Sequence, residues 1–199
     1  EILLPYKQST LGPSISSGDV NNDNLDDIFI GGSSGQPGQL FIQRNNRFEN
    51  KVISSFVEDR KYEDMESVFI DIDNDNDLDL YVVSGGNEFN NRSNLLQDRI
   101  YINDGNGNFT KDKQSELSDY TISGKSVSKI DFDKDGDIDL IVGNRIITQK
   151  YPLHEPSIIY ENVNGIFKNV TYKTAPEFED FGIVNKVITT DINNDGWED

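Results

Sequence analysis

Four nine-residue segments have the residue types and spacing of a cation-binding loop. We call them loop 1 (Asp19–Asp27), loop 2 (Asp71–Asp79), loop 3 (Asp131–Asp139) and loop 4 (Asp191–Asp199). Positions 1, 3, 5 and 9 are always Asp or Asn, whose oxygens suit a hard cation such as Ca²⁺, and the backbone carbonyl of position 7 adds a ligand. The predicted metal ligands are Asp19, Asn21, Asp23, Leu25, Asp27, Asp71, Asp73, Asp75, Asp77, Asp79, Asp131, Asp133, Asp135, Asp137, Asp139, Asp191, Asn193, Asp195, Trp197 and Asp199.

The other positions of the loops fit the same interpretation. Position 6 is always Asn or Gly, the two residues that best tolerate the left-handed backbone at a sharp turn. Position 2 is always large and apolar, which predicts an anchor in the protein interior. One Ca²⁺ per loop, up to four, would change the net charge from −18 to −10. We therefore expect the fold to depend on calcium.

Two alternatives compete with this interpretation. An EF-hand fails, because its bidentate Glu at position 12 is replaced by Ile30, Val82 or Val142 and its flanking helices by strand-like segments. Metal-free polar turns also favour Asp, Asn and Gly, and they remain the competing hypothesis. Four copies whose starts lie 52, 60 and 60 residues apart, together with repulsion among the carboxylates of one loop, favour a cation.

Loops 2 and 3 are expected to bind more tightly than loops 1 and 4. Positions 1, 3, 5 and 9 are all Asp in loops 2 and 3, whereas position 3 is Asn21 in loop 1 and Asn193 in loop 4. Because ligand charge tunes calcium affinity, the two middle loops have the advantage.

The elements that must position these loops are strands. Apolar segments flank each motif, as at Ser67–Ile70 and Leu78–Val83, and a hairpin with an Asn- or Gly-containing turn follows each of the first three. The hairpins run from Leu40 to Phe48, from Ile100 to Phe109 and from Ile158 to Phe167. Four strands with a period of 50 to 60 residues are typical of a propeller blade. Ile, Val and Thr number 42 and Ala occurs once, which also predicts an all-β fold.

Composition excludes several classes of protein. A pI near 4.3 and a net charge of −18 argue against nucleic acid as a partner. No apolar run is long enough to cross a bilayer, so no membrane insertion is expected. The absence of Cys excludes disulfides and thiol catalysis. The chain lacks an initiating Met and ends inside loop 4, which predicts a piece of a longer protein whose remaining blades are its partners.

The sequence predicts a binding module and no catalytic residues. The single His, His154, has no nucleophile elbow or phosphate-cradling loop near it. The regularly spaced acids are assigned to the loops. A scaffold without a ligand, or part of a calcium-dependent lyase or hydrolase whose catalytic residues lie elsewhere, stays open as an alternative.

The loops and hairpins resemble FG-GAP or VCBS repeats, the blades of integrin-α-like β-propellers. The motif Phe181-Gly182 before loop 4 and the segment Gly31–Pro37 match further elements of that family. Leu11–Asp19 together with Gln36–Gln43 is similar to bacterial proteins of the ASPIC/UnbV and cartilage-acidic-protein type. The resemblance implies an extracellular or cell-surface protein, in the periplasm or on the outer membrane if bacterial, with roles in adhesion.

The resemblance also implies an organisation for the chain. Family rings have about seven blades, so we expect a partial, open β-propeller of about three and a half four-stranded blades. Residues 1–11 would be an outer strand of a preceding or closing blade, followed by blades at 12–63, 64–123 and 124–180 and a truncated blade at 181–199. A protein or glycan ligand is expected on the face opposite the calcium loops. That face would be built from 84–99, 143–157, 53–64, 114–123 and 172–180, with Phe89, Arg92, Tyr120, Tyr151 and His154 as candidate contacts.

Overall fold

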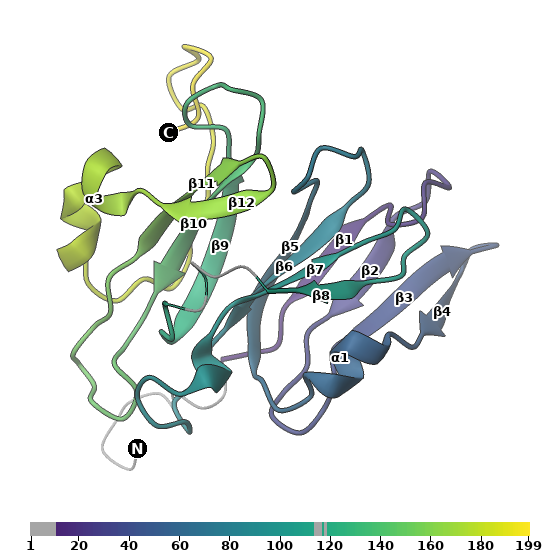
Figure 1. Ribbon diagram of the computed structural model, residues 1–199, viewed down its shortest axis with the longest axis horizontal. Helices are drawn as coiled ribbons and strands as arrows, with labels where there is room; N and C mark the ends of the chain where they lie inside the picture. Colours follow the sequence, from purple (N-terminus) through teal and green to yellow (C-terminus); the bar gives the residue numbers. More distant parts are fainter. Residues whose placement is uncertain (1–10, 114–116, 118) are drawn as a thin grey trace.

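Loops 1 to 3 each join the first two strands of a four-stranded antiparallel sheet (Figure 1). The computed structural model describes residues 11–113, 117 and 119–199. In each sheet the strands neighbour one another in sequence order. The sheets comprise β1 (Ile15–Gly18), β2 (Asp27–Ile30), β3 (Gln39–Arg44) and β4 (Arg47–Lys51); β5 (Asp64–Ile70), β6 (Asp79–Ser84), β7 (Arg99–Ile102) and β8 (Thr110–Asp112); β9 (Gly124–Ile130), β10 (Asp139–Asn144), β11 (Ile158–Val163) and β12 (Ile166–Asn169).

The first strands of successive sheets lie side by side, β1 against β5 and β5 against β9. The Ser16 hydroxyl donates to the Ser67 carbonyl at 2.8 Å, and the Val127 N–H donates to the Glu66 carboxylate at 3.3 Å. The sheets are therefore arranged as propeller blades with their first strands innermost. The described residues form an open arc, which confirms the predicted all-β, partial propeller.

The C-terminal segment, residues 181–199, runs beside β9 although it contains no regular strand. The Val187 N–H donates to Ser126 Oγ at 2.9 Å, and Thr189 Oγ1 donates to the Lys129 carbonyl at 2.8 Å. Val187 thus lies beside β9 much as Val127 of β9 lies beside β5. Of the strand expected over residues 1–11, only Leu11 belongs to the described residues.

Short helices lie in the segments that connect or follow the strands, and the sequence did not predict them. Those in the part of the chain that the structure describes are α1 (Ser54–Glu58) and α3 (Thr171–Thr174), together with the 3-10 helices η1 (Asn94–Leu96), between β6 and β7, and η2 (Pro176–Asp180). In α1, Phe56 is 3% exposed and packs edge-on against Tyr101. One buried aromatic side chain fixes this short helix, so no helical pattern is visible in the sequence.

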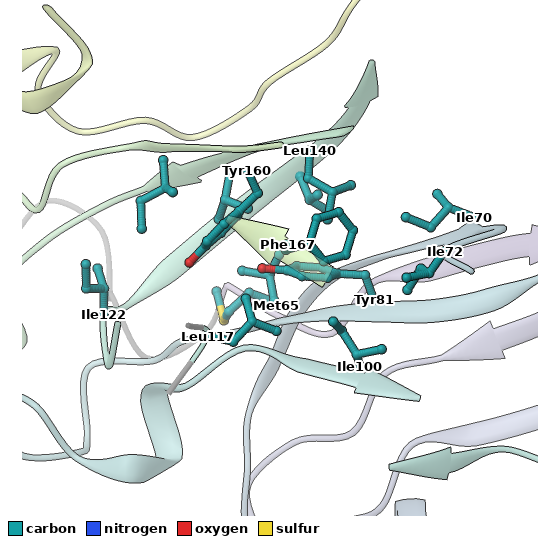
Figure 2. Packing of buried hydrophobic residues seen from close by; sticks show 14 residues of the cluster. Met65, Ile70, Ile72, Tyr81, Ile100, Leu117, Ile122, Leu140, Tyr160 and Phe167 are labelled. Atoms are coloured by element: carbon teal, nitrogen blue, oxygen red, sulfur yellow. The ribbon is translucent and has the colours of Figure 1, made fainter. Parts of the chain in front are cut away.

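The two hydrophobic cores lie between neighbouring sheets, and β6 contributes to both. Its side chains alternate, so Leu80 and Val82 enter the core shared with the first sheet, and Tyr81 and Val83 enter the core shared with the third. Figure 2 shows the second core, in which the ring of Tyr81 meets Phe167 edge-on. The middle sheet is therefore covered on both faces.

The three hairpins form as predicted, but their Phe residues differ in burial. Phe109 and Phe167 are 5% and 0% exposed, because each packs into the core shared with the preceding sheet. Phe48 is 49% exposed, because no sheet precedes the first among the described residues. At the tip of the third hairpin, Asn164 and Gly165 both have positive φ, as a tight hairpin turn requires.

Candidate metal centres

Position 9 of each of loops 1 to 3 is the first residue of the second strand of its sheet and is buried. Asp27 and Asp79 are 0% exposed and Asp139 is 1% exposed. One oxygen of each accepts the backbone N–H of position 2, at 3.0 to 3.2 Å. The other accepts a backbone N–H from the third strand or the residue after it, at 2.7 to 2.8 Å. These bonds fix the end of the loop against the sheet.

The carboxylates at positions 1 and 5 accept backbone hydrogen bonds within the loop. In loops 1, 2 and 4 the position 1 carboxylate accepts the N–H of position 6, at 2.7 to 3.0 Å. In all four loops the position 5 carboxylate accepts the N–H of position 7, at 2.8 to 3.0 Å. Since the same bonds recur at the same positions, the four segments share one local conformation.

The backbone is left-handed at two positions of every loop. Position 6 has φ between 64° and 98°, which agrees with its predicted Asn or Gly. Position 4 is also left-handed, with φ of 59° to 61° at Asn22, Asn74, Lys134 and Asn194. Sequence reasoning missed this second turn, because Lys134 gives no sign of it and Asn is common throughout the chain.

Positions 1, 3 and 9 converge in the two middle loops. One carboxylate oxygen from each of Asp71, Asp73 and Asp79 lies within 4.8 Å of the others, and Asp131, Asp133 and Asp139 form the same cluster. Asp71 Oδ1 and Asp131 Oδ1 are buried and have no hydrogen-bond partner. A buried acceptor without a donor is costly, by about 1 to 3 kcal/mol. These oxygens are the atoms that a bound cation would contact, so the residues present fit a metal ion.

The predicted ligands at positions 3, 5 and 7 are placed less uniformly. Asn21 Oδ1 in loop 1 is likewise buried without a partner, whereas Asn193 Oδ1 in loop 4 accepts the Asp195 N–H at 2.8 Å. Asp75 and Asp135, at position 5, stand outside the two convergent clusters.

Position 7 differs most between loops. Leu25 and Trp197 are 38% and 47% exposed, and Asp77 is 8% exposed. The Asp137 side chain accepts the Asn164 N–H at 3.2 Å. Sequence reasoning assigned this position only a carbonyl, whereas the Asp137 carboxylate also contacts the hairpin of its own blade.

The electrostatics of loops 2 and 3 favour binding of a positive charge. Burial, reinforced by Asp73 and Asp77, raises the pKa of Asp79 to about 7 despite its two N–H donors. Burial and the nearby Asp133 and Asp135 raise the pKa of Asp139 to about 6. A cation entering the loop would replace these protons and relieve the repulsion.

The opposite end of the sheets carries the long connections 85–98 and 145–157 (Figure 1). The five candidate contact residues differ in their surroundings. Arg92 pairs with Glu155 at 3.1 Å, His154 Nε2 lies 3.0 Å from Asp180, and the Tyr120 ring packs edge-on against Tyr160. Tyr151 is 47% exposed, and Phe89 is half-buried. Part of the predicted segment 114–123, namely 114–116 and 118, lies outside the described residues.

The family comparison agrees with this architecture. A family model described as an FG-GAP-like repeat matches residues 19–82 and again residues 71–142. None of the curated proteins compared with the chain matches it. A similar solved structure is that of an Agrocybe aegerita lectin described as recognising non-reducing terminal N-acetylglucosamine, with 18% identity and a TM-score of 0.49. The match covers 77% of this chain and 36% of the lectin chain.

Helices long and apolar enough to span a membrane are absent from the part of the chain that the structure describes.

The two family matches together extend over residues 19–142, and each contains two complete loops, loops 1 and 2 or loops 2 and 3. More than half of the sequence thus fits the repeat model. This chain belongs to the FG-GAP-like repeat family.

Proposed function

We propose that this chain is a calcium-binding FG-GAP repeat module of an extracellular or cell-surface protein and that it serves protein or glycan recognition. The observation that carries the metal assignment is the convergence of three carboxylates in loops 2 and 3, with Asp71 Oδ1 and Asp131 Oδ1 buried and unpartnered. The identity of the cation follows from the donors. They are all carboxylate, amide or carbonyl oxygens, a set that suits Ca²⁺ better than Zn²⁺ or Cu²⁺.

Calorimetric titration of the chelator-treated chain with calcium tests this assignment. We expect two tighter sites, in loops 2 and 3, and weaker binding in loops 1 and 4, because loops 1 and 4 each have one carboxylate fewer. Asp75→Asn and Asp23→Asn are matched variants, since both residues occupy position 5 and both accept the N–H of position 7 at 3.0 Å.

Asp75→Asn should weaken the loop 2 site roughly tenfold, and Asp23→Asn should leave the two tight sites intact. If Asp75→Asn weakened calcium binding no more than Asp23→Asn did, ligand charge would not set the order of affinity among the loops. Absence of calcium uptake by the unmodified chain would refute the metal assignment itself.

The recognition role rests on the separation of the two ends of the blades. The acidic loops and the hairpin turns occupy one end, and the longer connections occupy the other, where Tyr151 and Leu153 are 47% and 55% exposed. We assign no catalytic role, because the regularly spaced acids belong to the loops. Binding of a ligand at the end that carries the long connections would depend on calcium only through the stability of the blades.

Retention on immobilised glycans and cell-surface proteins tests the recognition role. We expect one partner to retain the chain in calcium and to release it in chelator. Tyr151→Ala should weaken that retention, whereas Phe48→Ala serves as the control, because Phe48 is 49% exposed on β4, outside every segment of the predicted ligand face. Retention that persists unchanged in Tyr151→Ala would place the contact elsewhere, and a complete lack of partners would favour a scaffold.

A further inference from the structure

A continuous run of buried hydrogen bonds connects loops 1, 2 and 3. It passes through two residues that no loop contains, Asn103 after β7 and Asn162 in β11. Both are nearly inaccessible, at 4% and 0% exposure. Sequence reasoning did not single out either residue, although both stand close to the turn of a hairpin.

Asn162 joins loop 3 to loop 2. Its backbone N–H donates to Asp139 Oδ1 at 2.8 Å, and its side-chain amide donates to the backbone carbonyl of Ile72 at 2.9 Å. Ile72 is position 2 of loop 2, and its own N–H donates to Asp79 Oδ2 at 3.0 Å. One asparagine thus holds the position 9 carboxylate of its own blade and the backbone of the preceding loop.

Asn103 repeats this arrangement one blade earlier. Its backbone N–H donates to Asp79 Oδ1 at 2.8 Å, and its side-chain amide donates to the Val20 carbonyl at 2.9 Å. The Val20 N–H in turn donates to Asp27 Oδ2 at 3.2 Å. The run therefore reaches from Asp139 through Asp79 to Asp27, with a position 9 carboxylate in each blade.

A second, more exposed link joins loop 2 to loop 3 and loop 3 to loop 4 through position 4. Asn74 Nδ2 in loop 2 donates to Asp137 Oδ1 in loop 3 at 2.7 Å. Lys134 Nζ in loop 3 donates to the Gly196 carbonyl in loop 4 and lies 3.8 Å from the centre of the Trp197 ring. Loops 2 and 3 thus share both a buried and a surface contact.

We propose that neighbouring loops bind calcium cooperatively, with Asn103 and Asn162 as the positioning residues that transmit order from one loop to the next. The inference rests on the proposed calcium function. A cation in loop 3 fixes Asp139, and through Asn162 it fixes the backbone of Ile72, whose N–H donates to Asp79. The ligands of loop 2 are then already in place when calcium binds there, so the entropic cost of ordering them is smaller and the affinity is higher.

Electrostatics opposes this coupling, because an ion in one loop weakens the negative potential at the next. The opposing effect is screened at an ionic strength of about 0.15 M, where the field of exposed charges fades over about 8 Å. Hydrogen-bonded contacts are not screened in this way when they are buried. Positive cooperativity is therefore expected in physiological salt and should decrease as salt is lowered.

The experiment compares calcium affinity at loop 2 in chains with and without a functional loop 3. Asp133→Ala disables loop 3, and the loop 2 site is identified by its loss in Asp73→Ala. Calorimetry in 0.15 M salt should show that Asp133→Ala weakens loop 2 by roughly fivefold or more. In an Asn162→Ala background the same Asp133→Ala change should have little further effect. If Asn162→Ala only destabilised the fold, it would lower the calcium affinity of loop 2 equally with and without Asp133→Ala, and the ratio of these two affinities would stay the same as in the chain that keeps Asn162.

Asn74→Gly provides a second variant, because Asn162 is fully buried and its replacement risks the fold. Glycine keeps the left-handed backbone of position 4 (φ 61°) and removes only the bond to Asp137. Asn76→Gly is the control, since it makes the same change at left-handed position 6 of the same loop. Asn74→Gly should reduce the effect of Asp133→Ala on loop 2, and Asn76→Gly should preserve it.

The outcomes separate this inference from the proposed function. If the calcium affinity of loop 2 does not depend on whether loop 3 is functional, the cooperativity is overturned and the calcium function stands. Coupling that survives equally in Asn162→Ala, Asn74→Gly and Asn76→Gly overturns the assigned contacts. A chain that binds no calcium in any loop refutes the proposed function instead.

Discussion

Chelation of calcium is expected to lower the Tm of this chain by about 10 to 20 °C. At 5 mM calcium and a Kd of roughly 10⁻⁴ M, each occupied site stabilises the native state by about 2 kcal/mol. Two such sites contribute about 4 to 5 kcal/mol, and in a domain of this size each kcal/mol shifts Tm by about 2 to 4 °C. Scanning calorimetry with calcium and with chelator measures the difference directly. Magnesium at the same concentration is the control, because it prefers to keep its water ligands.

The size of this calcium effect should depend on pH. The pKa values of Asp79 and Asp139 in the metal-free fold are about 7 and about 6, above the ordinary 3.8. A raised carboxyl pKa favours the folded state fully at pH below 4, and that stability is lost as pH rises through 6 and 7. Calcium requires the ionised form. The Tm difference should therefore be large at pH 7.5 and small at pH 5, and a difference independent of pH would contradict the assigned ligands.

Replacement of Arg99 is the second change with a large expected effect. Its side chain is 4% exposed, and the guanidinium pairs with Asp64 and donates to Ser84 Oγ at 3.2 Å and Tyr101 Oη at 3.0 Å. It also lies 4.2 Å from the centre of the Tyr62 ring. Arg99→Met keeps the aliphatic stem but leaves the Asp64 carboxylate buried without its counter-charge. We expect a loss of about 3 to 5 kcal/mol in the free energy of unfolding.

Urea unfolding in the presence of calcium measures this loss. Arg47→Met is the control, because Arg47 is exposed on β4. Asp64→Asn in the Arg99→Met background should restore part of the stability, because it removes the unpaired charge. In the unmodified chain the Gly32 N–H donates to Asp64 Oδ2 at 2.6 Å, and the amide oxygen of the new Asn can accept the same bond. A stability within about 1 kcal/mol of the unmodified chain would show that water reaches Asp64 when Arg99 is lost.

The local structure of the candidate metal centres was predictable because it depends on neighbours within nine residues. Asp at positions 1 and 5 accepts N–H groups two to five residues further along, and Asn or Gly at position 6 permits the turn. The alternation of apolar residues around each loop predicts strands, and the Asn164-Gly165 turn predicts a hairpin. These interactions depend on residue type and spacing, which the sequence states directly.

The contacts between blades were not predictable in this way. Asn103 reaches a carbonyl 83 residues earlier in the chain, and Asn162 reaches one 90 residues earlier. Nothing in the local pattern distinguishes these two from the other asparagines. Position 7 presents the same problem, since Asp137 contacts both its own hairpin and Asn74 of the preceding loop.

The sequence by itself determined the repeat, the all-β blades and the residues of the loops. The tertiary structure decided how one blade is placed against the next, and with it the buried pair of Arg99 and Asp64 and the hydrogen-bonded run between loops. The physical reason is one of range. Turns and strand pairing follow from steric and hydrogen-bond preferences of adjacent residues, whereas contacts between sheets depend on which side chains meet when two distant surfaces pack together.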